Sequence, residues 1–205
     1  ILISGCLWLL KGRFLRLRWA MYAFLIVLSF QFWENYQNQK FISITAYTTS
    51  KGNGWGFYTG NEGYLLAPVE LLANDDALTF HVKHHWWAKN TTDINLVESN
   101  EKNYCQPNFC KKGALLYFGG KIVAIDQTHP KADIWLIEDS QPKLLGQQRP
   151  SLVLINTKRP ALLATWREFC IQNNLEWVNC KALADKTIRW PNANSSKQLV
   201  TYAFL

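Results

Sequence analysis

The longest apolar run of the chain is Trp19–Trp33 (WAMYAFLIVLSFQFW), which contains no charged residue. As a helix rising about 1.5 Å per residue, this run alone falls short of a hydrocarbon core of about 30 Å. Counted from Leu15, with Arg16 and Arg18 reaching toward lipid headgroups, the segment is long enough. The pattern therefore predicts a transmembrane helix over residues 15–33. Aromatic residues suited to a membrane interface stand near its two ends: Trp19, Tyr22, Trp33 and Tyr36.

A second apolar stretch, Ile1–Leu10, precedes this run, and a basic loop at residues 11–14 separates the two. A signal peptide would begin at Met and end in small residues, which this segment does not, and a buried core helix is the other alternative. We expect residues 1–10 to be the end of a preceding transmembrane helix of a longer protein. Basic loops favour the cytoplasmic side, which predicts a multi-pass inner-membrane protein with a periplasmic C-terminal domain over residues 38–205. The topology-determining charges are Lys11, Arg13, Arg16 and Arg18.

The first half of the remaining chain predicts short strands. Alternating and apolar runs between turn signals such as Gly60-Asn61 are typical of strands. The expected elements are the strands Phe41–Tyr47, Gly54–Thr59, Gly63–Ala67 and Leu78–Val82, and a short helix VELLAN opened by Pro68. The polar segment Asn90–Lys112 is expected to be a loop-rich insertion.

The second half carries clearer signals. The sequence ALLYF-GG-KIVAID predicts a tight hairpin at Gly119-Gly120, because glycine accepts the positive φ angles of such a turn. Continuous apolar runs predict buried strands, and apolar residues at helical spacing predict an amphipathic helix that Thr157 could cap. The result is an α/β domain, rich in strands at its start and with a βαβ unit at its end. Its later elements are the strands Ala132–Glu138 and Ser151–Asn156, the helix Pro160–Gln172, and the strands Leu175–Asn179 and Leu199–Phe204.

The net charge of +7 suggests a nucleic-acid partner, but the charges are distributed unevenly along the chain. Four of the 22 Lys and Arg residues and none of the 15 Asp and Glu residues precede Trp33, so the rest of the chain carries 18 against 15, a net +3. A basic surface is therefore possible in a local region but is not required by the balance.

Five cysteines allow several pairings. Cys105 and Cys110 bracket the loop CQPNFC and could form a disulfide in an oxidising compartment. Zinc is the alternative for these two with Cys170 and Cys180, but neither pair has the C-x2-C spacing of a structural site. We favour a disulfide or free thiols, and we interpret Cys6 as a small apolar residue.

The segment HVKHHWWAK, residues 81–89, is the strongest local candidate for a binding site. Lysines offer phosphate contacts, and tryptophans offer faces on which unpaired bases stack without sequence preference. Three clustered histidines, His81, His84 and His85, could instead bind a metal, but no carboxylate or thiol adjoins them. A structural alternative is that one tryptophan fills the core while the lysines are solvated. The expected nucleic-acid contacts are Lys83, His84, Trp86, Trp87 and Lys89.

Other polar motifs are weaker. The glycines of KGNGWGF lack the following helix that a phosphate-binding loop needs, so turn chemistry before a strand is expected. Asp126, which follows the strand KIVAI, is expected to cap a turn. No serine stands in a nucleophile-elbow motif, so no catalytic triad is predicted.

The order of these segments resembles the C-terminal part of ComEC-type competence proteins, in the form typical of Bacteroidetes. The resemblance runs through FISITAYTTSKGNGWGFYTGNEGYLLA, ALLYFGGKIVAID, ADIWLIEDS and RPSLVLINTKRPALLATWREFCIQNNLEWVNC. Such proteins are polytopic inner-membrane proteins thought to form the channel for entry of single-stranded DNA during natural transformation. The resemblance implies a reduced, degenerate metallo-β-lactamase-like α/β domain, preceded here by one complete and one partial transmembrane helix.

The chain departs from the family's metal-binding pattern H-x-H-x-D-H. The nearest string begins at His129, and Lys131 and Ile134 stand where the second and last histidines would be. By order along the chain, Glu138 and Asp139 occupy the place of a later His-His pair. An ammonium group cannot coordinate a metal, so we expect no metal, no cofactor and no catalytic residue, and the motif argues against an enzyme without excluding one.

These features together predict a non-catalytic domain of a competence protein that takes part in uptake of single-stranded DNA. The expected partners are single-stranded DNA, other membrane proteins of the competence machinery and the lipid bilayer. Two alternatives stay open: a metal-dependent hydrolase or nuclease of metallo-β-lactamase type, and a membrane-tethered scaffold that contacts only proteins.

Overall fold

The structure, a computed structural model, describes residues 14–89, 91–126, 128–143, 149–180 and 187–191. The chain divides into two compact units, Ile1–Gln39 and Lys40–Leu205. The predictions for residues 1–10, for Lys11 and Arg13, and for the strand Leu199–Phe204 lie outside the described residues.

The described part of the first unit belongs to helix α2, Phe14–Lys40, whose last residue is the first of the second unit. The helix contains Arg16 and Arg18 near its beginning, and it continues past Trp33 through the polar segment that was expected to leave the bilayer. Charged or polar residues therefore flank the apolar run at both ends of the helix. In the residues that the structure describes, no helix combines the length and apolar character needed to cross a bilayer. The predicted transmembrane helix over residues 15–33 is therefore wrong, and with it the predicted multi-pass inner-membrane location.

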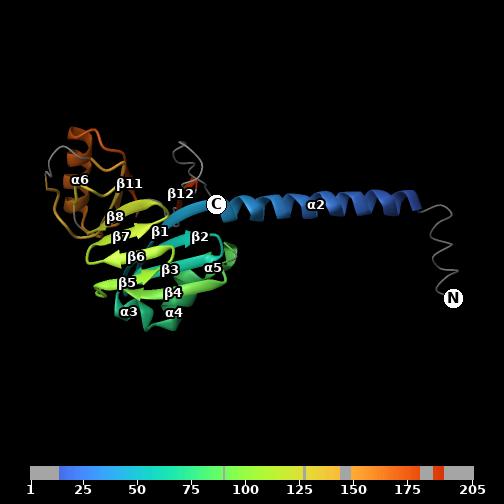
Figure 1. The fold of residues 1–205 in the computed structure, drawn as a ribbon, viewed down its shortest axis with the longest axis horizontal. Helices are drawn as coiled ribbons and strands as arrows, with labels where there is room; N and C mark the ends of the chain where they lie inside the picture. Colours follow the sequence, from blue (N-terminus) through green and yellow to red (C-terminus); the bar gives the residue numbers. More distant parts are fainter. Residues whose placement is uncertain (1–13, 90, 127, 144–148, 181–186, 192–205) are drawn as a thin grey trace. The chain divides into compact units, whose positions relative to one another are not determined.

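In the residues that the structure describes, the second unit contains two sheets (Figure 1). The first has five strands in the order β12-β1-β2-β3-β4, antiparallel except for the parallel pair β3–β4. Because β1 follows directly on α2, the chain enters this sheet in its interior, between β12 and β2. The strands are β1 (Phe41–Thr49), β2 (Gly52–Thr59), β3 (Glu62–Ala67), β4 (Asp93–Glu98) and β12 (Thr187–Pro191).

The second sheet has seven strands in the order β11-β10-β9-β8-β7-β6-β5. Strands β5 to β8 form an antiparallel meander, and β8 to β11 are parallel to one another. Helix α6, Pro160–Gln172, connects β10 to β11, which confirms the predicted βαβ unit. The strands are β5 (Asn103–Gln106), β6 (Phe109–Lys112), β7 (Leu115–Phe118), β8 (Lys121–Ile125), β9 (Ile134–Ile137), β10 (Leu152–Ile155) and β11 (Trp177–Asn179).

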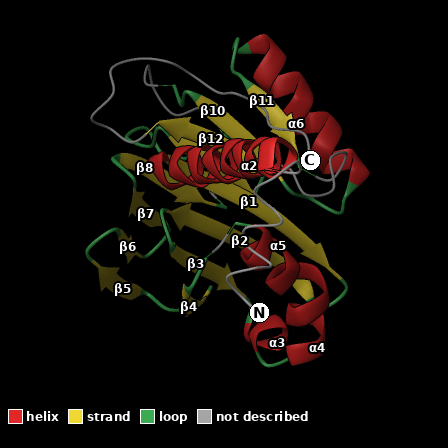
Figure 2. Ribbon diagram, turned by 90° about the vertical axis from the view of Figure 1, so that its right-hand side faces the viewer, coloured by secondary structure: helices red, strands yellow, loops and turns green. Residues whose placement is uncertain are grey.

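Among the described residues, three hydrophobic clusters hold the layers together. The largest lies between the sheets, where Phe57 of β2 meets Phe109 and Phe118 of the other sheet edge to face at 5.4 and 5.3 Å between ring centroids. The second cluster packs α6, through Trp166, against β9 and β10. The third packs the helical segments α3 (Val69–Leu72), α4 (Asp75–Leu78), η1 (Thr79–Lys83) and α5 (His84–Ala88) against the outer face of the five-stranded sheet (Figure 2).

The predicted fold class, a metallo-β-lactamase-like domain preceded by one complete and one partial transmembrane helix, is contradicted. The structure supports a mixed α/β fold built mostly of strands, without a membrane-spanning helix among the described residues. Two local predictions also fail. Leu78–Val82 is helical instead of extended, and the supposed loop Asn90–Lys112 contains β4, β5 and β6.

Candidate nucleic-acid-binding face

The segment that carries the candidate contacts is helical from Asp75 to Ala88. Asn74 begins it as an N-cap, with its Oδ1 accepting a hydrogen bond from the backbone N–H of Ala77 at 2.9 Å. The middle turn, Thr79–Lys83, is a π-helix, a form that is rare and often found at functional sites. Leu78, Val82 and Trp86 are buried at intervals of four, so one side of the segment faces the sheet.

Trp86 belongs to this inner side. Its indole is only 7% exposed and donates from Nε1 to the Tyr58 hydroxyl at 3.0 Å. Trp86 therefore fills the core, as the structural alternative expected for one of the two tryptophans, and its faces are not offered to bases.

The outer side of the segment presents aromatic rings to solvent. Phe80 is 73% exposed and Trp87 61% exposed, and His81 and His84 are also exposed. The rings form two edge-to-face pairs, Phe80 with His81 at 4.9 Å and His84 with Trp87 at 5.1 Å between centroids. We call these four residues the aromatic face. Sequence reasoning missed Phe80, although its spacing of four and seven residues to His84 and Trp87 would have placed it there once a helix was predicted.

The two lysines of the segment are engaged within the protein. Lys83 Nζ lies 2.5 Å from Asp75 Oδ1 in a salt bridge on the surface. Lys89 Nζ donates to Ser43 Oγ at 2.8 Å and lies 4.4 Å from the centre of the Tyr58 ring. The predicted phosphate contacts would have to compete with these interactions, so the exposed chemistry of the segment is more aromatic than cationic.

A polar network anchors α5 to the sheet below the aromatic face. Tyr58 and Tyr47 share a hydrogen bond between their hydroxyls, and Tyr47 is also bonded to His85 Nδ1 at 2.7 Å. Burial raises the pKa of the Tyr58 hydroxyl well above its ordinary range, so it stays protonated. Gly56 makes room for the pair, because a Cβ there would lie 2.5 Å from the Tyr58 hydroxyl oxygen.

The three histidines do not converge on a common point. His81 and His84 are exposed on the aromatic face, whereas His85 bonds to Tyr47 beneath it. Over the part of the chain that the structure describes, no group of three or more His, Cys, Asp and Glu side chains is arranged to hold a metal ion.

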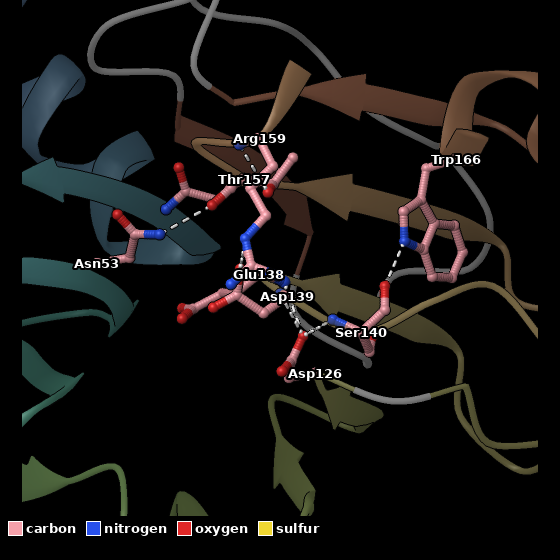
Figure 3. Close-up of polar contacts among 9 residues, drawn as sticks. Asn53, Asp126, Glu138, Asp139, Ser140, Thr157, Arg159 and Trp166 are labelled. Atoms are coloured by element: carbon pink, nitrogen blue, oxygen red, sulfur yellow. Dashed lines mark hydrogen bonds and ion pairs between the residues drawn. The ribbon is translucent and has the colours of Figure 1, made fainter. Parts of the chain in front are cut away.

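A second polar cluster lies where β8, β9 and β10 end (Figure 3). Asp126, with φ of 47°, follows β8, and its Oδ1 accepts from the backbone N–H groups of Glu138, Asp139 and Ser140 at 3.0, 2.7 and 2.8 Å. It therefore caps the loop after β9, in line with the turn-capping role expected for it. Arg159 Nε lies 3.6 Å from Asp139 Oδ1, and both side chains are largely exposed.

Glu138 links the two sheets at this end. Its Oε1 accepts a hydrogen bond from Trp55 Nε1 of β2 at 2.5 Å. The pKa of the Glu138 carboxyl is raised from 4.5 to about 7, chiefly by burial. The hydrogen bond from Trp55 lowers this pKa, and the charges of Asp126 and Asp139 raise it. A carboxyl that changes charge near neutral pH is a candidate acid–base group, which the sequence motif alone did not indicate.

The cysteines occupy two different environments. Cys105 and Cys110 form a disulfide between β5 and β6. Cys170 and Cys180 are both buried. Burial raises the pKa of the Cys170 thiol to about 11, so this thiol is expected to be inert.

Comparison with known proteins finds no match for this chain among protein-family models, curated proteins or solved structures.

Proposed function

We propose that the aromatic face binds the unpaired bases of single-stranded DNA, and that the protein takes part in DNA uptake during natural transformation without catalysing a reaction. The observation that carries the proposal is the exposure of Phe80 and Trp87 on one side of a helix whose other side is anchored in the core. The competence role is suggested by the sequence resemblance, and the aromatic face supplies a means of contact.

The chemistry of this face suits stacking better than phosphate binding. Stacking of one base on an aromatic ring contributes about 1–3 kcal/mol and tolerates any base, which passage of DNA of arbitrary sequence requires. Each of the two ring pairs offers an exposed aromatic edge or face for one base. With Lys83 and Lys89 already engaged, few counterions would be released on binding.

Binding to a fluorescently labelled oligodeoxythymidine, followed by anisotropy, tests the contact. Trp87→Ala and Phe80→Ala should each weaken binding by about 5- to 150-fold, the equivalent of one lost stacking interaction. Ile171→Ala is a matched control, because Ile171 is also 61% exposed but lies on α6. Equal binding by the Trp87 variant and the control would show that DNA does not use this face.

The salt dependence distinguishes stacking from a cationic surface. Each phosphate contact to a single strand contributes a slope of about −0.7 to a plot of log K against log salt concentration. Two lysines at most predict a slope no steeper than about −1.4. A steeper slope would mean that DNA binds elsewhere on the chain.

The role in uptake needs a cellular measurement. In a naturally transformable host that carries this gene, the double variant Phe80→Ala, Trp87→Ala should lower the transformation frequency, and Ile171→Ala should not. If the double variant no longer binds DNA in solution but transforms at the normal frequency, the aromatic face is not needed for DNA uptake. A scaffold role predicts that the aromatic face binds a protein and that none of the variants changes DNA affinity.

A further inference from the structure

The disulfide Cys105–Cys110 lies on an outer edge of the domain. Strand β5 is the edge strand of the seven-stranded sheet (Figure 1). Cys105 stands directly opposite Cys110 of β6 in the antiparallel register. Cys105 is an exposed residue and Cys110 a half-buried one, so Cys105 is the more accessible of the two to an attacking thiolate.

The hairpin that carries this disulfide is held by many other interactions. Phe109 is fully buried and stacks on Tyr64 with ring centroids 4.6 Å apart. At the hairpin tip, Asn108 Nδ2 donates to Glu62 Oε2 at 2.9 Å. The buried Lys111 donates to the backbone carbonyls of Ser99 and Glu101. Strand β6 is also paired along its whole length with β7.

The disulfide itself adds little constraint. It joins residues only five positions apart, and the stabilisation that a disulfide gives by restricting the unfolded chain decreases as the closed loop becomes shorter. A hairpin fixed by Phe109 and by pairing with β7 should therefore keep its structure when the bond is broken. A disulfide that involves an exposed cysteine and that the fold does not require differs from a buried structural disulfide.

The residues next to the Cys105–Cys110 bond also favour thiol–disulfide exchange. Lys112, two residues from Cys110 on the same strand, is exposed, and its charge stabilises a thiolate that leaves from Cys110. Tyr117 pairs with Cys110 across β6 and β7 and is 53% exposed, so it offers an aromatic contact beside the bond.

We propose that Cys105–Cys110 is a reversible thiol–disulfide exchange site whose substrates are dithiol reductants or glutathione-type thiols. A reductant thiolate attacks Sγ of Cys105 and forms a mixed disulfide, while the Cys105–Cys110 bond breaks and Cys110 leaves as a thiolate that takes up a proton. A second reductant thiol then attacks the mixed disulfide and releases Cys105. The reductant is oxidised to its disulfide, and the protein bond is reduced by two electrons. This site is separate from the aromatic face and does not depend on the proposed DNA binding.

The test uses the full chain with Cys6→Ser, so that Cys6 does not react. The protein is equilibrated in glutathione buffers of increasing reducing strength, quenched in acid and labelled with a maleimide that shifts its mobility in a gel. We expect two further thiols to appear within the glutathione range while the far-ultraviolet circular dichroism stays unchanged. A bond that stays oxidised until urea unfolds the protein, or a fold that is lost on reduction, would overturn the proposal.

A second measurement tests which sulfur is attacked. The Cys6→Ser chain is treated with reduced glutathione, quenched in acid and digested, and the mixed disulfide is located by mass spectrometry. We expect glutathione on Cys105, because this residue is exposed whereas Cys110 is half-buried. Glutathione found mainly on Cys110 would refute the assignment of Cys105 as the attacked sulfur.

Discussion

Single side chains of this domain connect its layers, and Glu138 does so with a group that titrates. The carboxyl is held by Trp55 of the opposite sheet, and its pKa of about 7 in the folded protein exceeds the ordinary value of 4.5. The folded state therefore binds a proton more tightly than the unfolded chain. The resulting stabilisation is complete below a pH of about 4.5 and is lost as the pH rises through about 7.

Replacing Glu138 by Gln should remove this pH dependence, because the amide keeps an oxygen for the Trp55 bond and carries no charge. Above pH 8, Glu138→Gln is expected to be more stable than the natural chain by about 2–3 kcal/mol. Urea unfolding between pH 4.5 and 8.5 measures the effect. Glu168→Gln is the control, since Glu168 is exposed on α6 and is not among the charges that act on Glu138. A variant with the same slope as the natural chain would assign the titration to another group.

The hydroxyl of Tyr58 has a comparable role at the other face of the five-stranded sheet. Tyr58→Phe leaves Trp86 Nε1 buried without its acceptor and removes the bond to Tyr47. An unsatisfied buried donor costs about 1–3 kcal/mol, so the free energy of unfolding should fall by that amount. Tyr117→Phe removes a hydroxyl from a side chain that is 53% exposed and should change little. Equal stabilities of the two variants would show that the network beneath the aromatic face contributes nothing.

Among the elements, the hairpin β7–β8 is fixed by its turn. Gly119 has φ of 56°, and a Cβ there would lie 2.4 Å from Ile42 Cδ1 of the opposite sheet, whereas Gly113, with φ of 63°, has open space around it. Gly113→Ala should cost about 1 kcal/mol from backbone strain alone. Gly119→Ala should cost about 1–3 kcal/mol more, from the added contact with Ile42. Thermal unfolding of both variants separates the cost of backbone strain from the cost of the contact with Ile42. Equal losses of stability in the two variants would mean that the sheets adjust around position 119.

The elements predicted from sequence are those with strong local signals. The Gly119-Gly120 hairpin and the helix Pro160–Gln172 appear as expected, since turn glycines and helical spacing act over a few residues. The predicted cap of that helix is wrong. The N-cap is Arg159, whose side chain makes no capping hydrogen bond. Thr157 Oγ1 instead accepts a hydrogen bond from the backbone N–H of Arg159.

The missed elements depend on distant partners. Leu78–Val82 has the alternation of a strand, but burial of Leu78, Val82 and Trp86 against the sheet makes it helical. Strands β4 to β6 are rich in polar residues and exist because β3 and β7 offer edges for pairing. For the same reason the sequence pointed to the segment 81–89 but assigned Trp86 to DNA, since which face of the segment is buried is a tertiary property. The carboxyl of Glu138 was noted only by its place in the chain, and its contact with Trp55 joins residues 83 positions apart.

For the molecule as a whole, the division into two units has a consequence for stability and solubility. All three hydrophobic clusters are formed by residues between Ile42 and Ile188. Helix α2, in contrast, exposes large apolar side chains in a continuous series, for example Phe24, Ile26, Phe30 and Phe32 at 63–74%. Exposed apolar surface of this extent promotes association of protein chains in water.

Removal of residues 1–39 should therefore leave the second unit folded and change how the chain behaves in solution. The shortened chain is expected to unfold in urea within about 0.5 kcal/mol of the full chain, because none of the clustered core residues is lost. It should also elute as a smaller species in size-exclusion chromatography with light scattering, whereas the full chain should associate. Substituting Phe24, Ile26, Phe30 and Phe32 with Ser in the full chain is the matched comparison, since it removes apolar surface without shortening the chain. If the shortened chain fails to unfold cooperatively, residues before Lys40 contribute to the stability of the second unit. If both chains associate equally, the surface responsible lies beyond residue 39.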